Sequence, residues 1–290
     1  MNVEAVIAST VRELLGVEVD ASVPLSGGCI HDVRRIDLVD GSRCVAKVSS
    51  PGHGLLLHEE LRGLEAIAES DSLRTPDVLG IQDAESCSVL LTEYLAPSTS
   101  GDVDWTSFGE QLGRLHVRAV GDRYGFDHDN HIGRTPQSNR WCDDWVGFLT
   151  EHRLGPQLAM ATHRGLLDSG AAASVQSIID RLDRLVPRSP TPSLLHGDLW
   201  SGNALPLADG GVAVLDPACW YGDAWFDIGM MRLFGGFPEA CFAVWQEMLP
   251  DRAQAAERVG IAQLYHLLNH LNLFGAGYRA QVEAVVRALA

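Results

Sequence analysis

The sequence predicts an α+β fold of two lobes: a small N-terminal lobe built on an antiparallel β-sheet with one key helix, and a larger, mainly helical C-terminal lobe. The first observation is that residues 17–92 contain short, loosely alternating apolar runs separated by Gly-Gly and Asp-Gly turns, which are typical of hairpins. The second is that helical periodicity dominates after Pro97. We therefore expect lobes over residues 1–92 and 98–290, joined by a hinge over residues 93–97.

The N-terminal lobe is expected to hold a leading helix, a sheet and a second helix. A 3.6-residue apolar period predicts the leading helix, and Gly16 is a typical residue to end it. Two apolar runs after Pro76, joined by a polar stretch, complete the sheet. The expected helices are residues 2–15 and 55–70, and the expected strands are 17–25, 30–39, 43–48, 78–81 and 89–92.

The C-terminal lobe is read as a set of amphipathic helices. His116, on the apolar stripe of the first helix, is interpreted as a core histidine. The polar, turn-rich segment 124–139 is either a loop that lines a binding site or a plain surface connection. The expected helices are residues 105–120, 141–152, 156–167, 224–234, 238–249, 252–274 and 277–290.

Residues 194–221 carry the chemically informative motif. Asp198 and Asn203 stand five positions apart, the spacing at which a kinase catalytic loop holds a base for the attacking hydroxyl and an amide ligand for Mg²⁺. Asp216 follows the apolar run 212–215, so a short strand can present its carboxylate as the second metal ligand. The alternative interpretation is an ordinary turn and a strand-capping carboxylate. Phosphoryl transfer needs mainly positioning and charge neutralisation, which these three side chains can supply.

Two departures distinguish this motif from that of a protein kinase. The residues after the second acid read Asp-Pro-Ala rather than Asp-Phe-Gly, and Gly197 replaces the usual Arg. The sequence therefore favours a small-molecule kinase with protein-kinase-like architecture.

Candidate nucleotide-binding residues lie in the N-terminal lobe. Lys47 stands in Val-Ala-Lys-Val, similar to the kinase strand whose Lys reaches the α- and β-phosphates and pairs with a helix Glu. Glu60 is the preferred partner, because it borders the apolar face of its helix, and Glu59 is the alternative. Gly27 and Gly28 form a turn that can approach phosphates closely, although most such turns are only hairpins.

Two further sets of residues are assigned by their position along the chain. Glu93, Tyr94 and Leu95 follow the last strand of the sheet, where hinge backbone groups can read the adenine edge. Trp200 and Trp220 lie next to the motif acids and either stack on a sugar face or pack the lobe.

Composition excludes several other classes of function. The chain has 290 residues, 46% of them hydrophobic, and a formal net charge of −16, which opposes binding to nucleic acid or an anionic membrane. Its N-terminus lacks a signal-peptide pattern and no apolar run reaches membrane-spanning length, so we expect a cytoplasmic protein.

The six cysteines contain no Cys-x-x-Cys pair and are expected to be reduced. Cys29 follows the glycine turn and is either a redox-sensitive thiol or a small turn residue.

A set of motifs spread over the whole chain matches one known family in order: residues 26–30, 46–48, Glu60, 124–136, 141–153, 196–203, 216–222 and 234–237. By these motifs the chain resembles the fructosamine kinase (ketosamine 3-kinase) family, within the aminoglycoside phosphotransferase-like kinases. The resemblance implies a protein-kinase-like two-lobed fold with ATP and Mg²⁺ as cofactors. It also implies that Asp198 is the proton acceptor, that Glu93 to Leu95 form the ATP-binding hinge, and that Asn203 and Asp216 bind magnesium.

The reaction implied by the resemblance is phosphorylation of the sugar C3 hydroxyl of a ketosamine, a glycation adduct that then releases its amine (deglycation). The alternatives are a kinase of another hydroxylated amine, such as an aminoglycoside or choline, and a nucleotide-binding regulator without catalysis. The sequence leaves open whether the substrate is a fructosamine or ribulosamine, whether it is free or protein-bound, and the oligomeric state.

Overall fold

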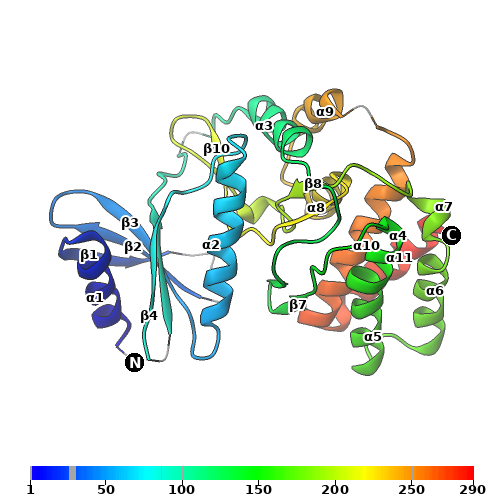
Figure 1. Cartoon of the computed structure of the whole chain (residues 1–290), viewed down its shortest axis with the longest axis horizontal. Helices are drawn as coiled ribbons and strands as arrows, with labels where there is room; N and C mark the ends of the chain where they lie inside the picture. Colours follow the sequence, from blue (N-terminus) through cyan, green and yellow to red (C-terminus); the bar gives the residue numbers. More distant parts are fainter. Residues whose placement is uncertain (1, 26–30, 86, 100, 250) are drawn as a thin grey trace. The chain divides into compact units, whose positions relative to one another are not determined.

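The computed structural model describes residues 2–25, 31–85, 87–99, 101–249 and 251–290, and the chain folds into two compact units (Figure 1). Unit 1 comprises Met1–Asp104 and Gly202–Pro217, and unit 2 comprises Trp105–Ser201 and Ala218–Ala290. The sequence-based division assigns residues 202–217 to the C-terminal lobe, whereas they fold with unit 1. This returning segment carries two motif residues, Asn203 and Asp216, into the unit that contains the sheet.

Unit 1 contains a five-stranded sheet in the order β1-β2-β3-β5-β4, and every neighbouring pair is antiparallel. Successive side chains of a strand point to opposite faces, which accounts for the loose apolar alternation in the sequence, and short turns between consecutive strands favour antiparallel pairing. The antiparallel sheet expected from the sequence is therefore confirmed. Its strands are β1 (Val19–Pro24), β2 (Asp32–Leu38), β3 (Arg43–Val48), β4 (Val78–Asp83) and β5 (Ser88–Glu93).

Helix α1 (Val3–Leu15) packs on one face of this sheet through Ile7 and Val11, which are fully buried. The sheet side of this core is apolar and comes from three strands: Ile36, Leu38, Cys44, Ala46, Val48, Val89 and Leu91. Asn2 caps the start of α1 by accepting the Ala5 N–H. Gly16 ends it in the left-handed conformation, with φ of 69°, as the sequence predicts.

Helix α2 (Gly54–Glu69) buries Leu57, Leu64 and Ile67 and lies against the returning segment of unit 1. At Gly63 a Cβ atom would stand only 2.8 Å from Cγ of Pro217, so glycine allows this close approach. The returning segment forms a hairpin of β9 (Ala204–Pro206) and β10 (Val212–Val214). Packing of α2 and of this hairpin within unit 1 positions the residues that follow β10.

Unit 2 is mainly helical, as the sequence predicts, with two short pairs of strands. The pairs are β6 (Asn130–Ile132) with β7 (Thr135–Gln137) and β8 (Ser193–Leu195) with β11 (Trp220–Gly222). Its α-helices are α3 (Trp105–Arg118), α4 (Trp145–Phe148), α5 (Gly155–His163), α6 (Ser169–Ile179), α7 (Leu182–Leu185), α8 (Trp225–Phe234), α9 (Glu239–Met248), α10 (Ala255–Phe274) and α11 (Arg279–Leu289).

The structure differs from the expected helices in several places. Helix α5 ends at His163 rather than at residue 167, and α10 begins at Ala255 rather than at residue 252. The helix expected over 141–152 begins at Trp145, because Asp144 caps it by accepting the Gly147 N–H at 2.8 Å. It then continues as a π-helical segment, Leu149–Leu154. Helices α6 and α7 were not predicted.

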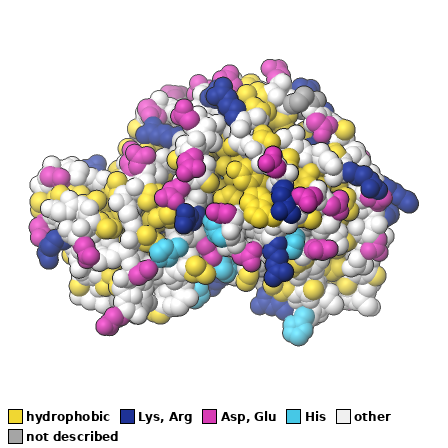
Figure 2. All heavy atoms as spheres, viewed as in Figure 1, with side chains coloured by type: hydrophobic (Ala, Val, Ile, Leu, Met, Phe, Trp, Pro, Cys, Tyr) yellow, Lys and Arg dark blue, Asp and Glu magenta, His cyan; other side chains and the backbone are white. Residues whose placement is uncertain are grey.

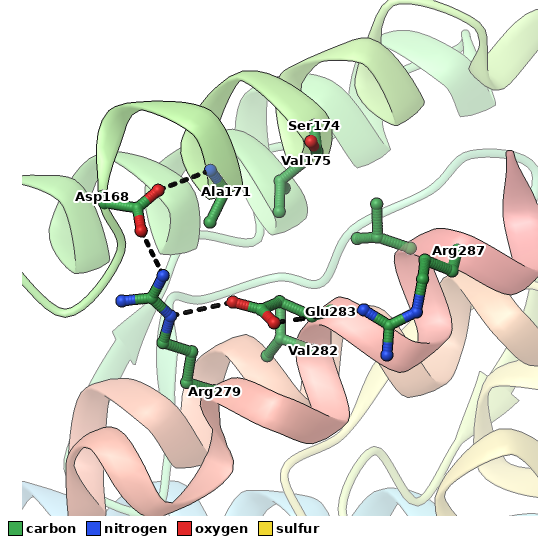
Figure 3. Close-up of a pocket in the computed structure, with 9 residues that line it drawn as sticks. Asp168, Ala171, Ser174, Val175, Arg279, Val282, Glu283 and Arg287 are labelled. Carbon is green, nitrogen blue, oxygen red and sulfur yellow. Dashed lines mark hydrogen bonds and ion pairs between the residues drawn. The ribbon is translucent and has the colours of Figure 1, made fainter.

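Helices α6 and α11 meet at a groove of about 280 Å³ (Figure 3). Arg279 of α11 pairs with Asp168, which caps α6, and donates to Glu283 on its own helix at 2.8 Å. The groove walls also carry the apolar side chains of Val175 and Val282. An ion pair and apolar contacts thus join α11 to α6 within unit 2.

No helix in the described part of the chain combines the length and the apolar composition that a membrane span requires.

Helices α8 and α10 pack closely at Gly229. A Cβ atom there would overlap the Cβ of Ala262 and stand 3.2 Å from the Val259 carbonyl oxygen. Protein interiors are packed too densely to absorb such an overlap without movement. Glycine at this position therefore sets the distance between the two helices.

We predict that Gly229→Ala destabilises the protein by about 1–3 kcal/mol, because overpacking outweighs the better helix propensity of Ala. The matched control is Gly170→Ala on α6, where the nearest atom to a new Cβ is Asp168 Oδ1 at 3.4 Å. Thermal unfolding of both variants measures the difference. A Gly229→Ala variant as stable as the control would contradict the packing argument.

Candidate active site

In unit 1, one ammonium group lies between two carboxylates. Lys47 on β3 makes ion pairs through its Nζ with Glu60 Oε1 and Asp216 Oδ1. Of the two glutamates that the sequence left open, Glu60 makes the described contact with Lys47. Lys47 and Glu60 are largely buried, whereas the Asp216 side chain is 50% exposed. Asp216 is therefore the member of this cluster that a ligand in solvent can reach.

Burial and charge act in opposite directions on this cluster. Burial lowers the pKa of Lys47, but the charges of Asp216 and Glu60 outweigh it, so the pKa lies above its usual value. Burial also raises the pKa of Glu60, and the ammonium that it shares with Asp216 compensates only in part. Lys47 is thus a permanent cation at neutral pH, suited to binding phosphate oxygens.

Asp216 and Asn203 supply the oxygen ligands that Mg²⁺ prefers. The Leu215 N–H donates to the Asn203 carbonyl oxygen at 2.9 Å, which ties the two residues' backbones together within unit 1. Asp216 has a φ of 53°, a strained value for a non-glycine residue and one that is found most often at functional sites. Among the described residues no group of three or more His, Cys, Asp or Glu could hold a metal. A carboxylate and an amide are ligand types that suit Mg²⁺, and the assignment of Asn203 and Asp216 to this metal stays a prediction.

The expected hinge residues have distinct environments within unit 1. The Glu93 N–H, at the end of β5, donates to the Asp77 carbonyl oxygen at 2.8 Å. Leu95 is buried with Leu207 and Ala213. The guanidinium of Arg35 lies 5.8 Å from the Tyr94 ring centre. Adenine recognition at this segment stays a prediction.

Three sequence-predicted residues, Gly27, Gly28 and Cys29, lie outside the described residues. Their assignments to phosphate binding and to redox sensitivity stay predictions.

In unit 2, the loop before Asp198 is held by a buried carboxylate that the sequence analysis missed. Asp227 on α8 is 1% exposed and accepts the backbone N–H groups of His196 and Gly197, each at 2.9 Å. Gly197 has a φ of 82°, and a Cβ there would overlap the Ala218 carbonyl oxygen. The motif position that departs from protein kinases therefore requires glycine in this chain.

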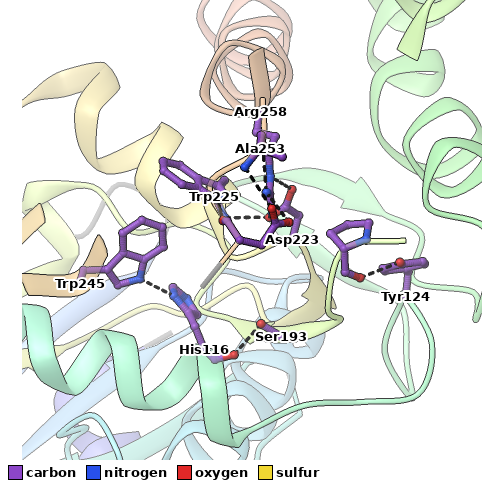
Figure 4. Close-up of polar contacts among 10 residues, drawn as sticks. His116, Tyr124, Ser193, Asp223, Trp225, Trp245, Ala253 and Arg258 are labelled. Carbon is purple, nitrogen blue, oxygen red and sulfur yellow. Dashed lines mark hydrogen bonds and ion pairs between the residues drawn. The ribbon is translucent and has the colours of Figure 1, made fainter. Parts of the chain in front are cut away.

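His116 completes the contacts of Asp227. The Trp245 indole N–H donates to His116 Nδ1 at 2.8 Å, so that nitrogen carries no proton. The proton is on Nε2, which donates to Asp227 Oδ2 at 3.1 Å. Figure 4 shows the Trp245 contact and the bond from Ser193 Oγ to the His116 carbonyl oxygen. His116 is buried in the core, as expected, and in addition it orients the carboxylate.

Burial raises the pKa of Asp227. The hydrogen bond from His116, the electrostatic effect of His116 and His196, and the hydrogen bond from the Gly197 N–H outweigh burial, so the pKa lies below its usual value.

The start of α8 is fixed as well. Asp223 accepts two bonds from Arg258 of α10, at 2.6 and 2.7 Å, and one from the Trp225 N–H at 3.1 Å (Figure 4). The helix that carries Asp227 is thus anchored at its N-terminus.

The two predicted aromatic residues have opposite environments. Trp200 is 39% exposed, and its backbone N–H donates to the Asp198 carbonyl oxygen at 3.1 Å. Trp220 is 1% exposed; its ring packs against Trp145 and Phe148, and the Arg153 guanidinium lies 4.1 Å from its centre. This placement favours packing of unit 2 for Trp220, whereas Trp200 offers an accessible ring.

Segment 124–139 carries a buried polar network rather than a plain surface connection. Arg153 donates to Asn139 Oδ1 at 2.7 Å, and Asn139 donates to Asn130 Oδ1 at 2.9 Å. Asn130 in turn donates to the Cys219 carbonyl oxygen at 2.9 Å. Burial lowers the pKa of Arg153 to about 10. This network fixes the backbone three residues beyond Asp216, and the sequence analysis did not identify it.

Comparison with known proteins points to one family. The family model described as fructosamine kinase matches residues 3–290. A probable ketoamine kinase of Synechocystis is 37% identical over 265 residues, covering 91% of this chain and 88% of that protein. A chloroplastic protein-ribulosamine 3-kinase of Oryza sativa subsp. indica is 35% identical, covering 90% and 76%. The crystal structure of a candidate fructosamine-3-kinase from Thermobifida fusca superposes with a TM-score of 0.88 at 30% identity, covering 98% of each chain. The protein-kinase-like fold class expected from the sequence is confirmed.

We predict that Asp227→Asn lowers stability at pH 7 by about 1.5–3 kcal/mol, because the amide cannot accept all three hydrogen bonds. The pKa of Asp227 is lower in the folded protein than in the unfolded chain, so its ionised carboxylate stabilises the fold at pH values above the unfolded pKa of about 3.9. This stabilisation is lost as the pH falls through the folded pKa. The difference between wild type and variant should thus be constant near neutral pH and shrink below about pH 4.

Chemical unfolding at a series of pH values measures this difference, with Asp183→Asn on α7, an exposed position, as the control. Equal stability of wild type and Asp227→Asn at pH 7 would rule out the proposed anchoring of the loop.

Proposed function

The chain belongs to the fructosamine kinase family, and from this membership we propose that it transfers the γ-phosphoryl group of ATP to the C3 hydroxyl of a ketosamine. The observation that carries the proposal is the cluster of Lys47, Glu60 and Asp216, which combines a fixed cation with an accessible carboxylate. A structural ion pair would not require a second, half-exposed acid in a strained backbone conformation. The phosphorylated ketosamine is unstable and releases its amine, so the net result is deglycation.

Each residue has one role in this proposal. Lys47 binds the α- and β-phosphates, and Glu60 holds the ammonium in place. Asn203 and Asp216 would hold Mg²⁺, which would supply positive charge to the transferred phosphoryl group. Asp198 orients the C3 hydroxyl and takes its proton. The oxygen–phosphorus bond to the sugar forms as the bond between the γ-phosphorus and the ADP oxygen breaks.

Asp198 suits the role of proton acceptor because its loop cannot rotate freely. The Asp198 N–H lies 3.3 Å from His196 Nδ1, and the preceding two N–H groups are bound by Asp227. Fixed geometry is the main resource of an enzyme that transfers a phosphoryl group through a loose transition state.

The acceptor site is assigned to Trp200, whose exposed ring can stack on the C–H face of a polyol. The formal charge of −16 suits an acceptor with a cationic amine, and Asp and Glu side chains are spread over the face seen in Figure 2. Fructosamines and ribulosamines both meet these requirements. The same charge disfavours nucleic acid as a partner, and a cytoplasmic location remains our prediction.

We predict that Asp198→Asn lowers kcat by about 10² to 10⁴-fold, the usual contribution of a positioned general base. Nucleotide affinity should change little, because Lys47 and the metal ligands are retained. Asp216→Asn should in addition weaken Mg²⁺-dependent nucleotide binding. Calorimetric titration of ATP analogues and steady-state kinetics distinguish the two variants. Turnover of Asp198→Asn at the wild-type rate would exclude Asp198 as the base.

We also predict that Trp200→Ala raises KM for ketosamines about tenfold or more, on the scale of ~1.5 kcal/mol for a lost aromatic contact. ATP hydrolysis without acceptor should stay unchanged, because Trp200 is not assigned to the nucleotide site. The assay uses a ribulosamine, a fructosamine, choline and an aminoglycoside with both proteins. Turnover of choline or the aminoglycoside without any ketosamine turnover would overturn the substrate class and leave the kinase assignment intact.

A further inference from the structure

Unit 2 carries a group of aromatic side chains on its surface that the proposed reaction does not use. The rings of Phe234, His270, Phe274 and Tyr278, here called the aromatic surface, follow one another. The ring centres are 4.8 Å apart from Phe234 to His270, 5.5 Å from His270 to Phe274, and 6.0 Å from Phe274 to Tyr278. Phe274 is 63% exposed, which is unusual for a large apolar ring. Phe234 is 38% exposed, whereas His270 and Tyr278 are half-buried. Contiguous exposed apolar surface commonly marks a binding site.

One end of the aromatic surface adjoins the catalytic loop. Phe234 ends α8 and is followed by Gly235 and Gly236, both with positive φ. A Cβ atom at Gly236 would stand 2.8 Å from Oγ of Ser201, the residue after Trp200. The turn that follows Phe234 therefore depends on glycine and reaches the loop at Gly236.

A second contact adjoins the same surface from the segment between β6 and β7, which lies beside the C-terminal end of α10 in Figure 1. Gly133, with a φ of 62°, forms this turn, and a Cβ there would stand 3.0 Å from Cδ1 of Leu273. Leu273 precedes Phe274 on α10. The aromatic surface is thus linked to the catalytic loop through Gly236, two residues after Phe234, and to segment 124–139 through Leu273, which precedes Phe274.

From this continuity we propose that the aromatic surface binds the amine-side substituent of the ketosamine and selects apolar or aromatic groups there. This inference rests on the proposed function. When the sugar of the ketosamine stacks on Trp200, the substituent on its amine extends along the neighbouring surface. Because this substituent is tethered to the bound sugar, it meets the aromatic surface at a high effective concentration, and even a weak contact adds to binding. Burial lowers the pKa of His270, so its ring is uncharged at neutral pH and adds to an apolar surface.

The chemistry of the surface identifies the kind of substrate. Aromatic ring faces favour phenyl and branched aliphatic groups over small polar ones. A second copy of the chain is a poorer occupant, because a stable dimer buries roughly 800 Å² per partner and four side chains supply far less. The adducts expected to react fastest are therefore those of amines with an apolar side chain next to the glycated nitrogen.

The experiment compares two fructosamines, the adducts of glycinamide and of phenylalaninamide, with wild type, Phe274→Ala and the control Val39→Ala. Val39 lies in unit 1 and is 62% exposed, which matches Phe274. We expect wild type and the control to prefer the phenylalaninamide adduct about 3- to 10-fold in kcat/KM, the range of one or two aromatic contacts. In Phe274→Ala the preference should fall to near one, with kcat/KM for the glycinamide adduct unchanged.

Each other outcome has one meaning. Turnover of both adducts with the same preference in Phe274→Ala as in wild type would overturn this inference and leave the kinase function standing. No turnover by wild type of either adduct, nor of the two corresponding ribulosamines, would overturn the proposed function, and the inference with it. An unchanged preference together with a dimer that Phe274→Ala dissociates in light scattering would assign the surface to a second copy of the chain.

Discussion

The buried carboxylate of Asp227 is the constraint on which the candidate catalytic loop depends. An uncompensated charge inside a protein costs several kcal/mol, so the donors that surround it cannot leave without a large loss of stability. Two of these donors are consecutive backbone N–H groups, at His196 and Gly197, and the third is His116. The charge thereby fixes the peptide backbone directly before Asp198. A neutral acceptor would bind the same groups more weakly, since hydrogen bonds to charged groups are about twice as strong.

The proposed chemistry is divided between two kinds of structural support. The charges that meet phosphate and metal are held in unit 1, where Lys47 lies on a central strand of the sheet and Asp216 follows a short strand. The proposed base belongs to unit 2, on a loop held by a helix. Rigid strands suit groups that must keep a fixed charge arrangement, whereas a loop held by hydrogen bonds can present a catalytic carboxylate from a fixed scaffold. The motif reads as one stretch in the sequence, but its residues contribute to both units.

Sequence periodicity predicted those parts of the structure in which one face of an element is buried. The strands of unit 1 and the long helices α3 and α10 were predicted because their apolar residues recur at the period of the backbone. Helix α6 was missed because its apolar stripe is short: the large apolar residues Val175, Ile178 and Ile179 lie in its C-terminal half, after a run of small residues. Trp220 was placed near substrate from its sequence distance to Asp216, but sequence distance does not reveal the direction of a side chain. Asp227 had a usable signal, a single acid within the apolar run Trp-Phe-Asp-Ile.

The buried guanidinium of Arg153 shows why such polar groups can be kept in a core. Its solvation is replaced by the carbonyl oxygens of Ser138 and His152, by Asn139, and by the faces of Phe148 and Trp220. Because a guanidinium has fixed donor directions, these partners must adopt one arrangement, which an apolar side chain of similar size would not impose. The arrangement orders the turn of segment 124–139 and, through Asn130, the backbone at Cys219. The free energy spent on burying this charge thus specifies the conformation of segment 124–139.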